Sequence, residues 1–276
     1  MRFAICQELY EDTEWSEQCR LIAEAGYTGI ELAPFSLGDN PAAVSDEQLD
    51  TVRTVAESHG LQIIGLHWLL ARTEGLYLTS PDALVRSRTA EYLGRLSEIC
   101  SHLGGTVMVH GSPFQRSLLP GVTMEQALEY AADVFQQALP AFERNSTVLC
   151  LEPLTSKETD FINTCEEAMG LIDRLDHPCL QLHQDVKAML GAEQDSIPDL
   201  IHRFHHACRH FHVNDTNLLG PGMGETDYEP ILRALVESEY DGWVSVEVFD
   251  YSPGAQHIAV ASLRHMQDVL ARLSST

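Results

Sequence analysis

Short apolar runs alternate with longer amphipathic segments along the whole chain. Several of the runs are continuously apolar and lack the alternation of a half-exposed strand, which indicates strands covered on both faces. The segments between them repeat apolar positions every three or four residues, as helices packed on one side do. We predict strands over residues 3–6, 28–32, 61–66, 106–109, 148–151, 179–184, 210–213 and 243–246.

The amphipathic segments predict a helix after each of these strands. Capping and stop residues support several boundaries: Ser45 with Gln48 forms a capping-box pattern, and Gly26 and Gly60 follow helical segments. The predicted helices span residues 14–25, 45–59, 82–103, 123–144, 163–175, 196–208, 228–238 and 253–273.

The regular alternation of strand and helix decides the fold class. Eight strand–helix units in 276 residues match an α/β fold, the (β/α)8 TIM barrel, which takes about 250 residues. No linker or low-complexity segment divides the chain, so we predict a single barrel domain over residues 1–276. A doubly wound open sheet is the competing arrangement.

A formal net charge of −24 disfavours phosphate backbones and anionic membranes as partners. The first residues lack a long apolar stretch, and no run is long enough to span a bilayer. Seven scattered cysteines without a Cys-x-x-Cys pair favour reduced thiols. We therefore predict a cytoplasmic protein that binds neither nucleic acid nor membrane.

Candidate chemistry concentrates where the predicted strands end. All strands of a parallel barrel end on the same rim, where catalytic groups gather. So many ionisable groups at one rim would repel one another or lose hydration unless a cation or substrate ties them together. Seven of the eight strands end on, or carry near their end, a side chain that binds metals or moves protons: Glu31, His67, His110, Glu152, Asp185, His212 and Glu247.

The last four of these residues form the strongest candidate set. Glu152, Asp185, His212 and Glu247 offer three carboxylates and one imidazole, which suit Mn²⁺, Mg²⁺ or Co²⁺ better than Zn²⁺. Cys150 lies two residues before Glu152, so it is expected one layer deeper, in the core. We predict a divalent-metal centre here, with Mn²⁺ as the preferred ion.

Residues near these strand ends are candidates for substrate contact. Glu158 either caps the helix after the fifth strand or reaches the substrate. Asp215 follows the seventh strand in a loop that continues into a glycine-rich segment, where the backbone can approach a ligand closely. His67 and His110 are either hydrogen-bond partners of the substrate or structural histidines.

Short motifs stand at or beside the predicted strand ends: residues 26–31 (GYTGIE), 151–153 (LEP), 158–161 (ETDF), 185–187 (DVK), 211–215 (FHVND), 221–224 (PGMG) and 246–247 (VE). In this order they resemble the sugar isomerase/epimerase family with the xylose-isomerase-like barrel. That family includes ketose 3-epimerases of the D-tagatose and D-psicose type. The resemblance covers nearly the whole chain.

The resemblance implies a site and a mechanism. Glu152, Asp185, His212 and Glu247 would hold the metal, and Glu152 and Glu247 would also act as the acid/base pair. The implied reaction is epimerisation or isomerisation of a ketose or keto-sugar through a cis-enediolate that the metal stabilises. One Glu removes a proton and the other returns it on the opposite face. A small-molecule sugar substrate and a homo-oligomer, dimer or tetramer, are implied as well.

Two positions depart from the ketose 3-epimerases of that family. Those enzymes carry a His three residues after the strand-six Asp and an Arg six residues after the strand-seven His, where this chain has Ala188 and Leu218. Lys187 and Asn217 are candidate replacements in substrate binding. The departures leave open a substrate such as a 3-keto-glycoside or an inosose. They also leave open dehydratase or lyase chemistry on the same metal core.

Two other functions fit part of the pattern. A three-zinc DNA-repair endonuclease of the same fold would use His67 and His110 as zinc ligands. The chain lacks that enzyme's further His and its Asp-x-His pair, and the net charge disfavours DNA. A sugar-binding barrel without catalysis predicts a damaged metal set, whereas all four ligand types are present here.

Overall fold

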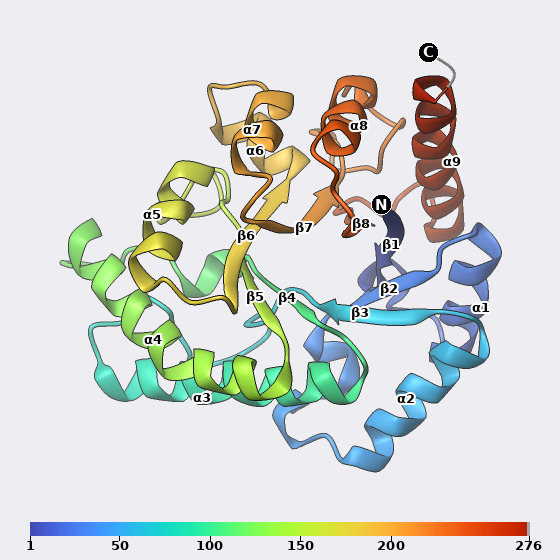
Figure 1. The fold of residues 1–276 in the computed structure, drawn as a ribbon. Coiled ribbons are helices and arrows are strands. Elements are labelled where there is room, and N and C mark those ends of the chain that lie inside the picture. The colour runs from blue at the N-terminus through green and yellow to red at the C-terminus, as the bar shows by residue number, and fades with distance from the viewer. Residues whose placement is uncertain (275–276) are drawn as a thin grey trace.

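Eight parallel strands close into a barrel in the computed structural model, which describes residues 1–274 (Figure 1). Each strand hydrogen-bonds with the next in sequence, and the last pairs with the first. The predicted (β/α)8 barrel is confirmed, and an open sheet is excluded. The strands are β1 (Arg2–Cys6), β2 (Gly29–Leu32), β3 (Gln62–Leu66), β4 (Val107–His110), β5 (Val148–Leu151), β6 (Leu180–Asp185), β7 (Cys208–Val213) and β8 (Trp243–Val246).

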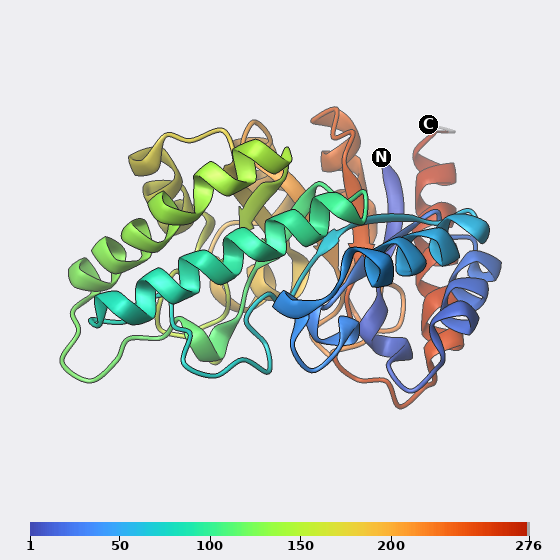
Figure 2. The ribbon, with the colours of Figure 1, turned by 90° about the horizontal axis from the view of Figure 1, so that it is seen from below.

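Helices follow the strands and surround the barrel (Figures 1 and 2). Their apolar faces pack inward; on α4, for example, Phe135 and Phe142 are fully buried. The long helices α3 and α4 lie side by side in both views. The α-helices are α1 (Trp15–Ala25), α2 (Asp46–Ser58), α3 (Ala83–His102), α4 (Met124–Asn145), α5 (Cys165–Leu175), α6 (Val186–Ala192), α7 (Ile197–Phe204), α8 (Tyr228–Glu237) and α9 (Ala255–Leu273).

Local sequence explains where several helices begin. Ser45 and Gln48 exchange hydrogen bonds at the start of α2, which confirms the predicted capping box. Thr164 and Glu167 form the same arrangement at the start of α5. A cap of this kind contributes about 1 kcal/mol to stability. The helix after β5 therefore has a cap of its own, and Glu158 does not serve as one.

The segment between β6 and β7 differs from the prediction. The helix predicted over residues 196–208 ends at Phe204, because β7 already begins at Cys208 to pair with β6. A further short helix, α6, starts directly after β6. Asp185 caps it by accepting a hydrogen bond from the backbone N–H of Ala188 at 2.7 Å. Helix α6 thus begins directly after Asp185, a predicted metal ligand.

The centre of the barrel is polar, whereas the layer between strands and helices is apolar. Glu31 projects into the barrel, and its Oε2 lies 2.8 Å from His210 Nε2. The rings of His183 and His212 have their centroids 4.2 Å apart. All four side chains are fully buried. Ionisable groups therefore extend from the rim into the axis of the barrel.

The two ends of the barrel carry different segments. In Figure 2 the N-terminal residue and the end of α9 lie on the upper side, and the loops after β3, β4 and β8 run along the lower side. These lower loops contribute side chains to the site described below. Among residues 1–274, no helix combines the length and the apolar character needed to cross a membrane.

Candidate active site

Four ionisable side chains converge at the carboxyl ends of neighbouring strands. Glu152 follows β5, Asp185 ends β6, His212 lies near the end of β7 and Glu247 follows β8. One ligand atom from each lies within 4.8 Å of the others. All four are buried, with Glu152 the most exposed at 7%. The residues predicted as a metal set are thus brought together; we call them the carboxylate–histidine set.

Hydrogen bonds orient the histidine of this set. His212 Nε2 lies 3.2 and 3.3 Å from the two oxygens of Glu31. Its other ring nitrogen, Nδ1, is 3.2 Å from Glu247 Oε2, yet within residues 1–274 it has no hydrogen-bond partner. A histidine that binds a metal through one nitrogen usually has its other nitrogen held by such a carboxylate. The unpartnered Nδ1 therefore fits the role of a metal ligand.

The carboxylates of the set are also held in place. Asp185 accepts hydrogen bonds from the backbone N–H of Ala188 and, at 2.6 Å, from the side-chain amide of Asn214. Glu247 Oε1 accepts one from the indole N–H of Trp68 at 2.8 Å. These contacts leave further oxygen lone pairs free. Three oriented carboxylates and one imidazole match the oxygen-rich ligand sets of Mn²⁺, Mg²⁺ and Co²⁺.

The two glutamates of the set differ in proton affinity. Burial, and then the charges of Glu247 and Asp185, raise the pKa of Glu152 well above its usual value. Burial opposes ionisation of Glu247 as well, but the charges of His212 and His67 outweigh it and lower the pKa of Glu247. Environments that push two pKa values apart are typical of an acid/base pair.

The carboxylate of Glu152 lies directly against the backbone at Gly111. Gly111 follows β4, and a Cβ atom at this position would lie 2.2 Å from Glu152 Oε2. Any larger residue would force the carboxylate away from the other ligands. The residue after His110 must therefore be glycine for Glu152 to keep this position.

A cavity of about 500 Å³ opens above the set. Its floor includes Glu152 and Glu247, and its walls include the aromatic side chains of Phe35, Trp68, Phe114 and Phe249. The rings of Trp68 and Phe249 are stacked with centroids 6.1 Å apart and planes at 17°. A volume of this size is in the range of small-molecule sites. The further wall residues are Ala71, Arg72, Gly111, Ser112, Pro113, Gln115, Leu154, Lys157, Glu158 and Lys187.

Two of the predicted substrate-contacting residues line this cavity. Lys187 Nζ lies 2.8 Å from Glu158 Oε1 and 4.1 Å from the centre of the Phe249 ring. Glu158 also accepts hydrogen bonds from the backbone and the hydroxyl of Thr155. Burial opposes ionisation of Glu158, but Lys187 outweighs it and lowers the pKa of that carboxyl. A charged pair thus faces the cavity beside Glu152.

The other predicted contacts lie outside the cavity lining. Asp215 accepts hydrogen bonds from the backbone N–H and the hydroxyl of Thr226, so it shapes the glycine-rich loop. His67 Nε2 is 2.7 Å from Glu8 Oε2. Burial and the charge of Arg116 lower the pKa of His110 to about 3, and the ring is therefore neutral. Direct sugar contact by Asp215, His67 or His110 stays a prediction.

The structure also brings to the site residues that the sequence did not single out. Cys6 and Glu8 lie at the end of β1 and just after it, the strand for which no chemical group was named. His183 and His210 precede Asp185 and His212 by two positions, a spacing that places each pair on one face of a strand. Those spacings were visible in the sequence. Nothing in the pattern pointed to Arg116, Phe35 or Phe249.

Comparison with known proteins identifies the family to which the chain belongs. A family model described as "Xylose isomerase-like TIM barrel" matches residues 19–269. The chain belongs to this family. The predicted resemblance is thereby confirmed over most of the sequence.

Individual relatives of known name are sugar epimerases. D-psicose 3-epimerase of Ruminiclostridium cellulolyticum is 26% identical over 250 residues, which cover 87% of this chain and 81% of that protein. The 3-dehydro-D-guloside 4-epimerase of Escherichia coli is 24% identical and covers 84% and 86%. A crystal structure of D-psicose 3-epimerase with D-tagatose, from Clostridium cellulolyticum H10, superposes with a TM-score of 0.86 over 98% of this chain and 99% of that one, at 21% identity. These relatives support the predicted enzyme class, a sugar isomerase or epimerase.

Proposed function

We propose that the protein is a divalent-metal-dependent epimerase or isomerase that acts on a ketose or keto-sugar through a cis-enediolate. The observation that carries this proposal is the buried carboxylate–histidine set, of which Glu152 and Glu247 line the floor of the cavity. The sugar epimerases among the relatives support the reaction type. Mn²⁺ as the ion, the cytoplasm as the compartment and a homo-oligomeric state belong to the same proposal.

The residues of the set fit a divalent ion through their donors and through His212 Nδ1, which faces Glu247 Oε2 and makes no hydrogen bond among the described residues. When bound there, such an ion would polarise a carbonyl oxygen and make the neighbouring C–H bond more acidic. Asp185 and His212 would hold the ion from β6 and β7. Their hydrogen bonds with Asn214 and Glu31 fix both side chains before a substrate arrives.

Glu152 and Glu247 would move the proton. They follow β5 and β8, so they reach the floor of the cavity from different strands. One carboxylate would take the proton from the carbon next to the ketone, and the other would return it on the opposite face of the planar enediolate. Inversion at that carbon follows from the two directions of approach. A positioned acid and base contribute about 10²- to 10⁴-fold to the rate.

The decisive experiment follows hydrogen exchange with solvent. The purified, Mn²⁺-loaded protein is incubated in deuterated water with free ketoses, 3-keto-glycosides and inososes, and the products are examined by NMR. We expect deuterium at the carbon next to the ketone, together with an epimer of at least one compound. The same spectra reveal loss of water if the reaction is a dehydration. Absence of label from all three compound classes contradicts the proposal.

Lys187 is proposed to orient the sugar beside the pair. Its ammonium lies at the cavity wall with Glu158 as partner, so it can donate to a sugar hydroxyl. We expect Lys187→Met to raise KM about tenfold or more, since a hydrogen bond from a charged group contributes about 1.5–3 kcal/mol. Steady-state kinetics on the substrate found by NMR measure this. Lys157→Met is the matched control: this exposed lysine lines the same cavity, and an equal rise in KM for it would contradict the specific role of Lys187.

A further inference from the structure

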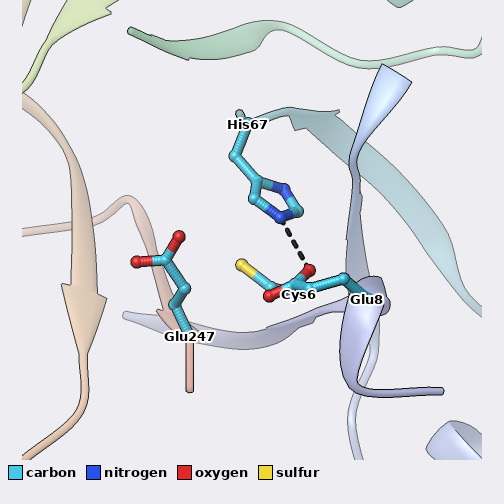
Figure 3. Close-up of side chains that lie close together, drawn as sticks. All are labelled: Cys6, Glu8, His67 and Glu247. Carbon is cyan, nitrogen blue, oxygen red and sulfur yellow. Dashed lines mark hydrogen bonds and ion pairs between the residues drawn. The ribbon is translucent and has the colours of Figure 1, made fainter. Parts of the chain in front are cut away.

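A second group of metal-binding side chains lies beside the carboxylate–histidine set (Figure 3). Cys6 ends β1, Glu8 lies in the 3-10 helix that follows (Gln7–Tyr10), and His67 comes directly after β3. Glu247 completes the group and belongs to both. One ligand atom from each residue lies within 4.8 Å of the others, and all four are buried. We call this group the Cys6 cluster.

The hydrogen bonds inside the Cys6 cluster leave donor atoms unused. His67 Nε2 contacts Glu8 Oε2 at 2.7 Å, the pair marked by the dashed line in Figure 3. The other oxygen, Glu8 Oε1, has no hydrogen-bond partner among the described residues, although Glu8 is only 2% exposed. Figure 3 shows the sulfur of Cys6 between the carboxylates of Glu8 and Glu247. A buried carboxylate oxygen without a partner is costly, and a cation would satisfy it.

The charges around the cluster point the same way. The ammonium of Lys187, which is partly buried at this end of the barrel, is already paired with Glu158. The carboxylates that converge here, all buried, are Glu8, Glu31, Glu152, Asp185 and Glu247.

We propose that the Cys6 cluster is a second divalent-cation site, joined to the first through Glu247. A thiolate, an imidazole and two carboxylates form the kind of ligand set that takes Zn²⁺ or Co²⁺ rather than Mg²⁺. Glu247 is placed to bridge, because its Oε2 faces His212 at 3.2 Å while the residue also belongs to the Cys6 cluster. The two sites thus select different ions: a hard, oxygen-preferring cation in one and a thiophilic cation in the other.

Cobalt titration of the metal-free, reduced chain tests this directly. Metal analysis after equilibrium dialysis gives the number of ions bound, and a thiolate-to-cobalt charge-transfer band in the near ultraviolet reports a Co²⁺–sulfur bond. We expect two Co²⁺ per wild-type chain and this band. Cys6→Ser should abolish the band and remove one equivalent. Glu8→Gln, which keeps the thiol, should weaken the second equivalent while circular dichroism shows an unchanged fold.

Two control variants separate this site from the one in the proposed function. Cys150→Ser removes another buried barrel cysteine and should keep both ions and the band. Asp185→Asn should lose the ion of the carboxylate–histidine set and keep the band, so the two proposals fail separately. One Co²⁺ per wild-type chain without the band overturns the second site. A band that survives in Cys6→Ser overturns it too.

Discussion

Replacing Glu152 by Gln is expected to lower kcat/KM by about 10³-fold or more, because the side chain keeps its shape and loses the ability to exchange a proton. Solvent deuterium should no longer enter the substrate at a measurable rate. The metal-free variant should be at least as stable as the wild type. Burial and the charges of Glu247 and Asp185 raise the pKa of Glu152, so a neutral amide removes repulsion from the folded state.

The metal content of this variant must be measured alongside its rate, since Glu152 belongs to the metal set as well. A variant that retains the ion and loses exchange assigns the proton transfer to this carboxylate. A variant that loses both the ion and the hydrogen exchange shows that Glu152 is needed first as a metal ligand. Glu166→Gln, an exposed position at the start of α5, is the control and should change neither. Activity within tenfold of wild type for Glu152→Gln would contradict the assignment of the pair.

The strand ends were predictable from sequence for a physical reason. Buried parallel strands are read as continuous apolar runs, and the first charged residue after such a run marks the rim. Glu152 and Glu247 were found in this way. Glu31 was assigned to the rim too, but it lies one residue before the end of β2 and points into the barrel, where His210 and His212 hold it.

The walls of the cavity were less accessible to such reasoning. Phe35 and Phe249 lie in loops or a 3-10 turn, where no periodicity predicts which side chains meet. The hydrogen bond from the indole N–H of Trp68 to Glu247 likewise became visible only in three dimensions. Helix α6 escaped prediction because it is short and is capped by Asp185, a residue already assigned to metal binding. Asp185 is thus both the cap of a helix and a proposed metal ligand.

Arg116 is the residue that sequence reasoning had least chance to find. It is fully buried, and within residues 1–274 its hydrogen bonds go to backbone carbonyls rather than to a carboxylate. Burial lowers the pKa of Arg116 to about 10, so the guanidinium stays charged at neutral pH. The carbonyl oxygens that accept from it belong to His110, Gly111, Glu152, Phe161 and Ile162. One side chain thus ties the end of β4, the end of β5 and the following loop together.

Arg116→Met is expected to destabilise the protein by about 4 kcal/mol or more, because several buried carbonyls lose their donors at about 1–3 kcal/mol each. Since the bond to the Glu152 carbonyl, at 2.7 Å, fixes the backbone of one member of the proposed acid/base pair, kcat should fall in the fraction that remains folded. Denaturant unfolding and kinetics at low temperature measure the two effects.

Arg86→Met is the control: this arginine is 13% exposed, pairs with Asp133, and its loss should lower the stability by about 1 kcal/mol. Arg116→Lys should recover only part of the stability, because a single ammonium cannot reach carbonyls spread over three segments. Equal stability of Arg116→Met and wild type would show that the segments hold Glu152 in place without the guanidinium.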